Sequence, residues 1–450
     1  MSDLLHDAYE RAIRYQTQID QRDAFPSPSA LADLAVFDEA LPANPQAPEE
    51  TLALLDDYGS PATVATTGRR YFGFVTGGSL TIAQAANWLA TIWDQNGALY
   101  VMSPINAKLG SVVLAWLSDL FGLPSGTGGA FVTGATMANF TALAAARHLL
   151  LKRQGWDVEA QGLFGAPELK VVVGDEAHVT LFKALSMLGL GRDRVIRVPV
   201  DEQGRMRADA LPDLDSKTLV CIQAGNVNSG AFDPAEAICA RANAAGAWVH
   251  VDGAFGLWAL ASREQAALGA GLALADSWIT DGHKWLNVPY DSGIVLCKHP
   301  EALRAAMSTS ANYLVDSGQR EPSQYTPELS RRARVIDVWA ALRTLGKAGV
   351  EDLVSRTCGL ARQFADRLRA EGIRVHNEVV LNQVVVSFGT PEQTQAVISA
   401  IQVDGTLWAG KTIWQGNHAM RISVSSWAST PEDVERSAQR VLEIAQQVKA

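Results

Sequence analysis

The lysine at position 284 lies among aromatic and apolar residues, in a setting that suits covalent chemistry. It belongs to the segment Thr280-Asp281-Gly282-His283-Lys284-Trp285-Leu286, which continues a short strand-like run. Desolvation by such neighbours disfavours the ammonium form, and an uncharged amine is what attack on a carbonyl carbon requires. Taken alone, the segment is better explained as a surface loop with an ordinary lysine. A catalytic role therefore depends on other residues that would share a site with it.

A segment rich in small residues has the features of an anion-binding turn. Residues 126–140 combine an apolar run of strand length, the turn Thr133-Gly134-Ala135-Thr136 and the start of a helix. Small residues let backbone N–H groups approach an anion at a helix N-terminus, where the helix dipole also favours negative charge. The segment lacks both the third glycine of a dinucleotide-binding fingerprint and the Gly-Lys-Ser/Thr of a P-loop. A tight turn without a ligand explains it equally well.

Two further polar residues follow strand-like runs. His178 ends Gly174-Asp175-Glu176-Ala177-His178, and Asp252 ends Trp248-Val249-His250-Val251-Asp252. Open α/β sheets bind ligands at the carboxyl ends of their strands. Alone, His178 is better explained as the first residue of a helix, and Asp252 equally well as a helix cap or as the partner of a cation. Four such segments at successive strand ends, however, indicate one shared site.

Together the four segments supply what pyridoxal 5′-phosphate (PLP) requires. They offer a phosphate cradle, an acid for a pyridinium nitrogen, an imidazole that can stack on a ring and an amine for the cofactor aldehyde. The sequence resembles the group II PLP-dependent amino acid decarboxylases, which have the aspartate aminotransferase fold, or fold type I. The resemblance runs from about Tyr71 to the C-terminus. It is most specific at His283-Lys284-Trp285 and Val251-Asp252-Gly253-Ala254.

The resemblance implies a role for each matching residue. It makes Lys284 the lysine that binds the cofactor, Asp252 the partner of the pyridine nitrogen and His178 the ring over one cofactor face. The other cofactor-binding residues that it implies are Ala254 on the opposite face, Ala135 and Thr136 in the phosphate turn, His283 beside the phosphate, and Asn226 and Asn228. The two asparagines replace part of a usually threonine-rich segment, so their contacts stay open. Arg421 matches an arginine that binds the substrate carboxylate, with a strand-edge salt bridge as the equal alternative.

Gly282 and the loop that follows the large domain depart from the resemblance. Gly282 stands where the family commonly has proline, which changes loop stiffness more than chemistry. The loop from Ser308 to Glu328 corresponds to a mobile catalytic loop but is shorter than in the aromatic decarboxylases. Its protonating tyrosine matches Tyr325, and Tyr313 is the other candidate. Asp281 is explained equally well as a cap of its own loop.

The pattern of apolar runs predicts the elements that position these residues. Strand-length runs at 130–132, 171–173, 195–198, 219–223, 248–251, 277–280 and 294–296 alternate with helical stretches. Uninterrupted apolar runs are typical of strands buried on both faces, and intervening helices are typical of parallel crossovers. We therefore expect an α/β protein of the PLP-dependent transferase fold type I, with a mostly parallel seven-stranded sheet and a smaller C-terminal α+β domain. The expected divisions are a helical arm (1–60), a large PLP-binding domain (61–307) and a small domain (308–450).

Several helices follow from the same patterns. We expect helices at 83–89 and 109–120 that cover the sheet, and long helices at 328–345 and 350–371. In the small domain, strands near 384–388, 408–414 and 420–424 would pack against a helix through 397–401 and a closing helix from Pro431.

Composition narrows the possible partners and location. The chain has 450 residues, of which 48% are hydrophobic and 19% charged, and its formal net charge is −10. This acidic balance argues against nucleic acid, whose backbone needs a basic face. Four separated cysteines without a CxxC pair indicate neither a disulfide framework nor a metal site. No signal-peptide pattern and no apolar run of the ~18–20 residues that span a membrane are found, so we expect a cytoplasmic protein without membrane contact.

The resemblance implies a lyase of amino acid metabolism that converts an L-amino acid to its amine and CO₂, as a homodimer with active sites at the interface. The same residues also support carbon–carbon cleavage of a β-hydroxy amino acid, transamination or oxidative deamination. A cofactor-binding protein without turnover is a further alternative, against which the joint presence of His178 and Asp252 argues. The aromatic residues of Tyr71-Phe72-Gly73-Phe74 and Trp93 suit an aromatic or otherwise apolar substrate, and equally a core position.

Overall fold

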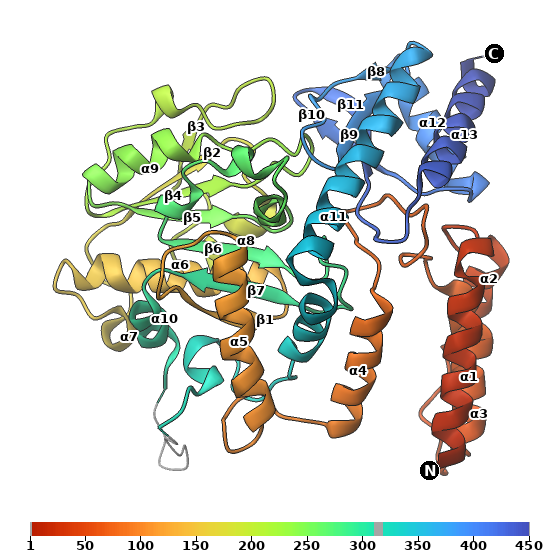
Figure 1. Cartoon of the computed structure of the whole chain (residues 1–450), viewed down its shortest axis with the longest axis horizontal. Helices are drawn as coiled ribbons and strands as arrows, with labels where there is room; N and C mark the ends of the chain where they lie inside the picture. Colours follow the sequence, from red (N-terminus) through yellow and green to blue (C-terminus); the bar gives the residue numbers. More distant parts are fainter. Residues whose placement is uncertain (1, 310–317, 450) are drawn as a thin grey trace.

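The structure is a computed structural model that describes residues 2–309 and 318–449 and contains two β-sheets (Figure 1). In this part of the chain the strand orders are β1-β7-β6-β5-β4-β2-β3 in the larger sheet and β10-β11-β9-β8 in the smaller one. The larger sheet consists of β1 (Gly128–Val132), β2 (Lys170–Gly174), β3 (Ile196–Val198), β4 (Thr218–Gln223), β5 (Trp248–Asp252), β6 (Ser277–Asp281) and β7 (Gly293–Cys297). The smaller sheet consists of β8 (Arg374–Val375), β9 (Gln383–Ser387), β10 (Gly410–Trp414) and β11 (Asn417–Ser423).

Most strands of the larger sheet run parallel. β2 pairs in parallel with β3 and β4, β4 with β5, and β5 with β6, while β7 is antiparallel to both β6 and β1. The carboxyl ends of β1 to β6 therefore meet at one edge. Side chains pack on both faces: along β4, Leu219 and Cys221 contact one core and Val220 and Ile222 the other. Burial on both faces explains the uninterrupted apolar runs, and the predicted, mostly parallel seven-stranded sheet is confirmed.

Helices cover both faces of the larger sheet (Figure 1). The described helices are α1 (Ser2–Gln18), α2 (Pro28–Asp33), α3 (Pro48–Leu54), α4 (Thr81–Trp93), α5 (Pro104–Leu120), α6 (Ala135–Lys152), α7 (Val158–Gln161), α8 (Val179–Met187), α9 (Ala235–Ala244), α10 (Pro300–Met307), α11 (Val335–Ala370), α12 (Pro391–Asp404) and α13 (Pro431–Lys449). α6 packs with α8 and α10 on one face, whereas α5, α9 and α11 contribute to the core on the other. Within the described ranges, no helix combines the length and apolar character needed to cross a membrane.

The long helix α11 joins the two sheets. Its first half packs Val338 and Ala341 into the core of the larger sheet, and its second half packs Phe364 and Leu368 against the smaller one. Gly346, with φ 60° and ψ −176°, interrupts the helix between the halves. The antiparallel sheet, α12, α13 and the second half of α11 make the expected smaller α+β part of the fold. The division at 60/61 and 307/308 stays a prediction.

The expected helix from residue 328 is wrong at its start, because α11 begins at Val335. The preceding residues are held in an irregular conformation by contacts with distant segments. Arg332 forms an isolated β-bridge with Asn96, and the Arg331 guanidinium donates to the Phe131 carbonyl at 3.2 Å and to the Thr326 hydroxyl at 2.6 Å. These tertiary contacts override the local helical preference.

α4 does not cover the sheet as its sequence pattern suggests. It packs against α11, and its Asn87 side chain donates to Asp337 Oδ2 on that helix at 2.7 Å. Asp337 is 5% exposed, and its Oδ1 has no hydrogen-bond partner among the described residues. Burial raises the pKa of Asp337 to about 6 from its ordinary value of 3.8. The α4–α11 contact therefore contains a carboxylate that is unfavourable when ionised.

We expect Asp337→Asn to stabilise the protein at about pH 8 and much less at about pH 4. Because the folded-state pKa of Asp337 is raised, the folded protein binds this proton more tightly, and stability falls as pH rises from about 4 to about 6. Asparagine removes the charge and still accepts from Asn87, so the variant should be more stable than the wild type by about 3 kcal/mol at the higher pH. Thermal unfolding at the two pH values measures the difference. Asp366→Asn, at a 72% exposed side chain on α11, is the control, and an equal change at both pH values would contradict the assignment.

Candidate active site

The carboxyl edge of the larger sheet gathers the residues that the sequence singled out. The phosphate turn follows β1, His178 follows β2, Asn226 follows β4, Asp252 ends β5, and the His283–Lys284 pair follows β6. The strand register fixes their spacing, since Asp252 lies opposite Gln223 of β4 and Ile279 of β6. Segments more than a hundred residues apart are thereby brought to one edge.

Lys284 meets a carboxylate at this edge. Its Nζ lies 3.0 Å from Asp281 Oδ2, and its side chain is 21% exposed. Trp285 and Leu286, the neighbours from which the sequence suggested an apolar environment, point into the core. The segment before α4 passes directly beside the lysine, because a Cβ on Gly77 would lie 1.7 Å from the Lys284 carbonyl oxygen. Asp281 thus contacts the lysine itself, beyond the loop-capping role considered for it.

The turn before α6 forms a cradle beside His283. Gly134 is the N-cap of α6 and offers no side chain to the first-turn N–H groups, which include those of Ala135 and Thr136. A Cβ on Gly134 would lie 3.2 Å from the His283 ring, so the imidazole borders the turn. A Cβ on Gly293 would come within 2.5 Å of the Gly134 Cα, so only glycine allows this close approach.

His283 presents an N–H to this region. Its Nδ1 accepts a hydrogen bond from the Ser292 backbone N–H at 2.9 Å, and its Nε2 lies 3.5 Å from Asp281 Oδ2. Burial lowers the pKa of His283, which favours the neutral ring with its proton on Nε2. The other oxygen of Asp281, Oδ1, is buried without a hydrogen-bond partner among the described residues. Free first-turn N–H groups and this oxygen are polar atoms that a bound ligand would satisfy.

The Asp252 carboxylate is buried and held by two donors. Asn139 Nδ2 donates to its Oδ2 at 3.0 Å, and the Ala254 backbone N–H donates to its Oδ1 at 3.2 Å. The side chain is fixed in one orientation at the end of β5, with the residue 6% exposed. Ala254 follows directly, half-buried beside the carboxylate.

His178 begins a helix, which is one of the two roles that the sequence left open, and its role toward a cofactor stays a prediction. It is the N-cap of α8, where its Nδ1 accepts from Thr180, at 2.8 Å from the hydroxyl and 3.4 Å from the backbone nitrogen. Burial lowers the pKa of His178, and the charges of Asp252, Lys284, Arg421 and Asp281 also act on its ring. The neutral ring therefore keeps its proton on Nε2, and the charged residues of the edge surround it.

Arg421 and the two asparagines meet where the two sheets approach each other. The Arg421 guanidinium donates to the Val227 carbonyl at 3.2 Å and lies 3.5 Å from Asn228 Oδ1. No carboxylate of residues 2–309 or 318–449 forms an ion pair with it, and burial lowers its pKa to about 10. Asn226 is 1% exposed, and its Oδ1 accepts from the backbone N–H groups of Asn228 and Ser229. Asn226 thus shapes the turn, whereas Arg421 is a half-buried cation without a counter-ion among the described residues.

Comparison with known proteins identifies the family. The model of the pyridoxal-dependent decarboxylase conserved domain matches residues 35–388. The chain belongs to the pyridoxal-dependent decarboxylase family. An aromatic-L-amino-acid decarboxylase of Bacillus atrophaeus is 28% identical over 338 residues, which cover 72% of this chain and 68% of that protein. An L-2,4-diaminobutyrate decarboxylase of Acinetobacter baumannii is 26% identical over 402 residues, covering 82% and 79%. The crystal structure of Oryza sativa TDC with PLP and tryptamine has a TM-score of 0.90 at 20% identity, over 99% of this chain and 97% of that one.

This decarboxylase is a carboxy-lyase that uses PLP, as the sequence predicted. The residues at the sheet edge fit that cofactor. The glycine-capped start of α6 and the His283 N–H provide donors for a phosphate, and the Lys284 amine lies half-buried beside them. The roles of the individual residues, Asp252, His178, Ala254 and the asparagines among them, stay predictions.

Glu176 lies at the carboxyl edge of the larger sheet, and the sequence did not indicate a role for it. Its Oε2 accepts from Asn226 Nδ2 and from the Trp414 indole, both at 2.8 Å, and its Oε1 accepts from Gln415 Nε2 at 3.1 Å. One carboxylate thus ties the β2 and β4 turns to the β10–β11 hairpin, whose second strand carries Arg421. Glu176 stands two residues before His178, but no local pattern distinguishes it from a solvent-exposed acid.

We expect Glu176→Gln to raise KM about tenfold with a smaller effect on kcat. Glutamine turns an NH₂ group toward one of the three donors, and a hydrogen bond to a charged group contributes about 1.5–3 kcal/mol. The hairpin that carries Arg421 then loses part of its attachment to the larger sheet. Steady-state kinetics measure the effect. Glu378→Gln, at an ion-paired surface carboxylate, is the control, and an unchanged KM in Glu176→Gln would contradict the role.

Of the two candidate loop tyrosines, the structure describes only Tyr325. Tyr325 ends a short 3-10 helix, Pro322–Tyr325, where the Arg320 guanidinium lies 4.2 Å from its ring centroid. Its ring packs on the α6–α10 side of the sheet. Its role as proton donor stays a prediction. Tyr313 lies outside the described residues.

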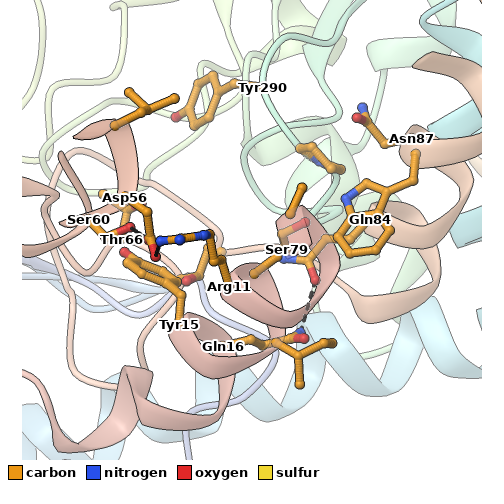
Figure 2. A pocket seen from close by; sticks show the side chains of 18 of the residues that line it. Arg11, Tyr15, Gln16, Asp56, Ser60, Thr66, Ser79, Gln84, Asn87 and Tyr290 are labelled. Atoms are coloured by element: carbon orange, nitrogen blue, oxygen red, sulfur yellow. Dashed lines mark hydrogen bonds and ion pairs between the residues drawn. The ribbon is translucent and has the colours of Figure 1, made fainter. Parts of the chain in front are cut away.

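A cavity of about 560 Å³ lies between the N-terminal helices and the segment before α4 (Figure 2). It is bridged by an ion pair between Arg11 and Asp56 at 3.0 Å and by a hydrogen bond from Gln16 to Gln84 at 3.0 Å. Tyr290 lines the cavity, and its ring stacks on His283 with a centroid distance of 4.3 Å. The Tyr290 ring therefore contacts both this cavity and His283.

Proposed function

We propose that this decarboxylase converts an L-amino acid with an aromatic or otherwise apolar side chain to its amine and CO₂. The observation that carries the substrate class is a stack of aromatic rings in the segment that passes Lys284. Trp408 stacks between Tyr71 and Phe74, with centroid distances of 5.2 Å on each side. Phe74 is 64% exposed and stands three residues before Gly77, whose backbone touches Lys284. An exposed aromatic face on the segment that contacts the Lys284 backbone suits a flat, apolar side chain.

The aromatic-L-amino-acid decarboxylase of Bacillus atrophaeus supports this substrate class, whereas the diaminobutyrate decarboxylase shows that the family accepts other side chains. The ring stack favours an aromatic substrate over a diamino acid. Arg421, the half-buried cation without a counter-ion among the described residues, would bind the substrate carboxylate.

Each residue at the carboxyl edge of the larger sheet has a separate role in the proposed reaction. When bound, PLP supplies an electron sink for the pair left on the α-carbon as the carboxylate departs as CO₂. Lys284 provides the amine that holds the cofactor, and His283 with the start of α6 binds its phosphate. Asp252 holds a proton at the pyridine nitrogen, because its carboxylate is buried and fixed by Asn139 and Ala254. His178 covers one face and donates from Nε2.

A panel of amino acids tests the proposal. The holoenzyme is incubated with aromatic, acidic and diamino acids and with a β-hydroxy amino acid, and CO₂, amine, aldehyde and peroxide are measured in parallel. We expect CO₂ and amine in equal amounts, with aromatic substrates turned over fastest. Preference for an acidic or diamino acid would contradict the substrate class. Aldehyde with peroxide, or aldehyde without CO₂, would favour oxidative deamination or carbon–carbon cleavage.

We further propose a homodimer whose interface includes α4 and residues 99–105, next to the active site. α4 exposes Leu89 (54%), Ile92 (63%) and Trp93 (45%), and Val101 and Met102 nearby are 64% and 46% exposed. Contiguous apolar surface of this kind is typical of protein contacts. α4 directly follows the segment that passes Lys284, so a second copy seated there would border the site.

We expect Ile92→Asp to convert the dimer to monomer in light scattering, because a charge at the centre of an apolar interface stays unpaired. Val403→Asp, at a residue that is 88% exposed on α12, is the matched control and should leave the mass unchanged. A wild-type protein that is monomeric and fully active would contradict the dimer.

We also propose a cytoplasmic location. All four cysteines are buried and free, as expected of a chain that works in a reducing compartment.

A further inference from the structure

We propose that Asn139 and His250 are positioning residues of this decarboxylase. They belong to a buried hydrogen-bond chain that holds the Asp252 carboxylate in the orientation that the cofactor ring nitrogen requires. The proposal rests on the role of Asp252 proposed above. It adds two residues, on α6 and β5, that contact neither substrate nor cofactor and act through Asp252.

The chain begins at an indole and ends at the carboxylate. Trp248 Nε1 lies 3.0 Å from Ser277 Oγ, and Ser277 Oγ lies 2.9 Å from His250 Nδ1. His250 Nε2 lies 2.8 Å from Asn139 Oδ1, and Asn139 Nδ2 lies 3.0 Å from Asp252 Oδ2. Trp248 is 1% exposed, Ser277, His250 and Asn139 are fully buried, and Asp252 is 6% exposed. No link of the chain is shared with bulk solvent.

The chemistry of the end groups fixes the direction of every hydrogen bond. An indole N–H only donates, so Ser277 Oγ accepts from Trp248. A carboxylate only accepts, so Asn139 turns its NH₂ group to Asp252 and its oxygen to His250. His250 must then donate from Nε2, which leaves Nδ1 to accept from the Ser277 hydroxyl. Burial lowers the pKa of His250 to about 4, which agrees with this neutral form. All the donors point toward Asp252, and aligned bonds in a dry interior strengthen one another.

Asn139 and His250 connect the helix of the phosphate turn with the strand that ends at Asp252. Asn139 lies four residues after Ala135, one turn into the helix whose N-terminus forms the phosphate turn. His250 lies two residues before Asp252 on β5, so both side chains point to the same face of the sheet. α6 therefore fixes the phosphate turn and the acid of the pyridine nitrogen together. A core that only needed filling would be served by apolar side chains, which are often no less stable than buried polar groups.

The test loads the enzyme with PLP labelled with ¹⁵N at the ring nitrogen and reads the ¹⁵N signal at one fixed pH. Asn139→Leu keeps the size of the side chain and removes the donor to Asp252. We expect the ratio of protonated to unprotonated ring nitrogen to fall at least tenfold. Ser277→Ala, two links further from the carboxylate, should change the ratio in the same direction by less. Asn382→Leu is the matched control, since Asn382 is a fully buried amide that donates to Ser425 in the smaller α+β part of the fold.

The outcomes separate the chain from the role of Asp252. A shifted signal in Asn139→Leu and Ser277→Ala, with a wild-type signal in Asn382→Leu, supports the proposal. A wild-type signal in Asn139→Leu overturns it if Asp252→Asn shifts the signal. An equal shift in Asn382→Leu also overturns it, because general loosening would then explain the effect. If Asp252→Asn itself leaves the signal unchanged, the role of Asp252 fails, and the proposal fails with it. Should Asn139→Leu not fold, Ser277→Ala decides alone, and an unshifted signal there overturns the chain.

Discussion

Replacing Lys284 with alanine should lower turnover by about 10⁴-fold or more, the scale seen when the nucleophile of a catalytic unit is removed. The Lys284 side chain is half-buried, its amine lies beside Asp281, and its backbone carbonyl lies against Gly77. Alanine leaves the phosphate turn intact, so the cofactor should still bind, but without a covalent bond. We expect cofactor absorbance that is lost on dialysis and a protein mass without added cofactor after borohydride reduction.

Lys298→Ala provides the control for this variant. Lys298 follows β7 and is exposed, so its removal should leave turnover and cofactor content unchanged. If Lys284→Ala kept activity within tenfold of the wild type, another amine would have to hold the cofactor.

Asp252→Asn should bind the cofactor and lose about 10²–10³-fold in kcat, the effect of removing one preorganised electrostatic group. Asparagine fills the same space and still accepts from Ala254 or Asn139. It brings no negative charge to the end of β5, so a proton at the ring nitrogen loses its partner. Asp193→Asn, at a side chain that is 92% exposed, is the surface control. Near-normal kcat with full cofactor content would show that another group holds that proton.

The sequence predicted the larger sheet well, for a physical reason. Strands buried on both faces are largely apolar, so β1, β2 and β4 to β7 appear as short apolar runs. The edge strand β3 differs, because Ile196 and Arg197 are exposed. The residues after those runs meet because parallel strands share one edge, which is why His178, Asp252 and Lys284 were found together.

Contacts between distant segments were beyond the reach of the sequence. Local pattern gave Lys284 an apolar environment, but the fold turns Trp285 into the core and Asp281 toward the amine. Asn139 and His250 lie in segments that the sequence singled out, but the sequence assigned them no role. Their hydrogen bond joins residues that are 111 positions apart. Glu176 similarly acquires its role from Asn226, Trp414 and Gln415, which are 50 to 239 residues away.

Residues 328–334 show the same limit in secondary structure. Their composition favours a helix, and the bridge between Arg332 and Asn96 prevents it. α4 has the amphipathic pattern of a sheet-covering helix, yet it packs on α11 and leaves apolar residues exposed.

Reductive labelling of the holoenzyme is the most direct test of the active site described here. Borohydride reduction fixes the cofactor to the amine that holds it, and peptide mapping then identifies the labelled lysine. The structure predicts a single label on Lys284, beside Asp281 and the start of α6. A label on Lys183 or Lys298, or no label on a protein that retains bound cofactor, would contradict it.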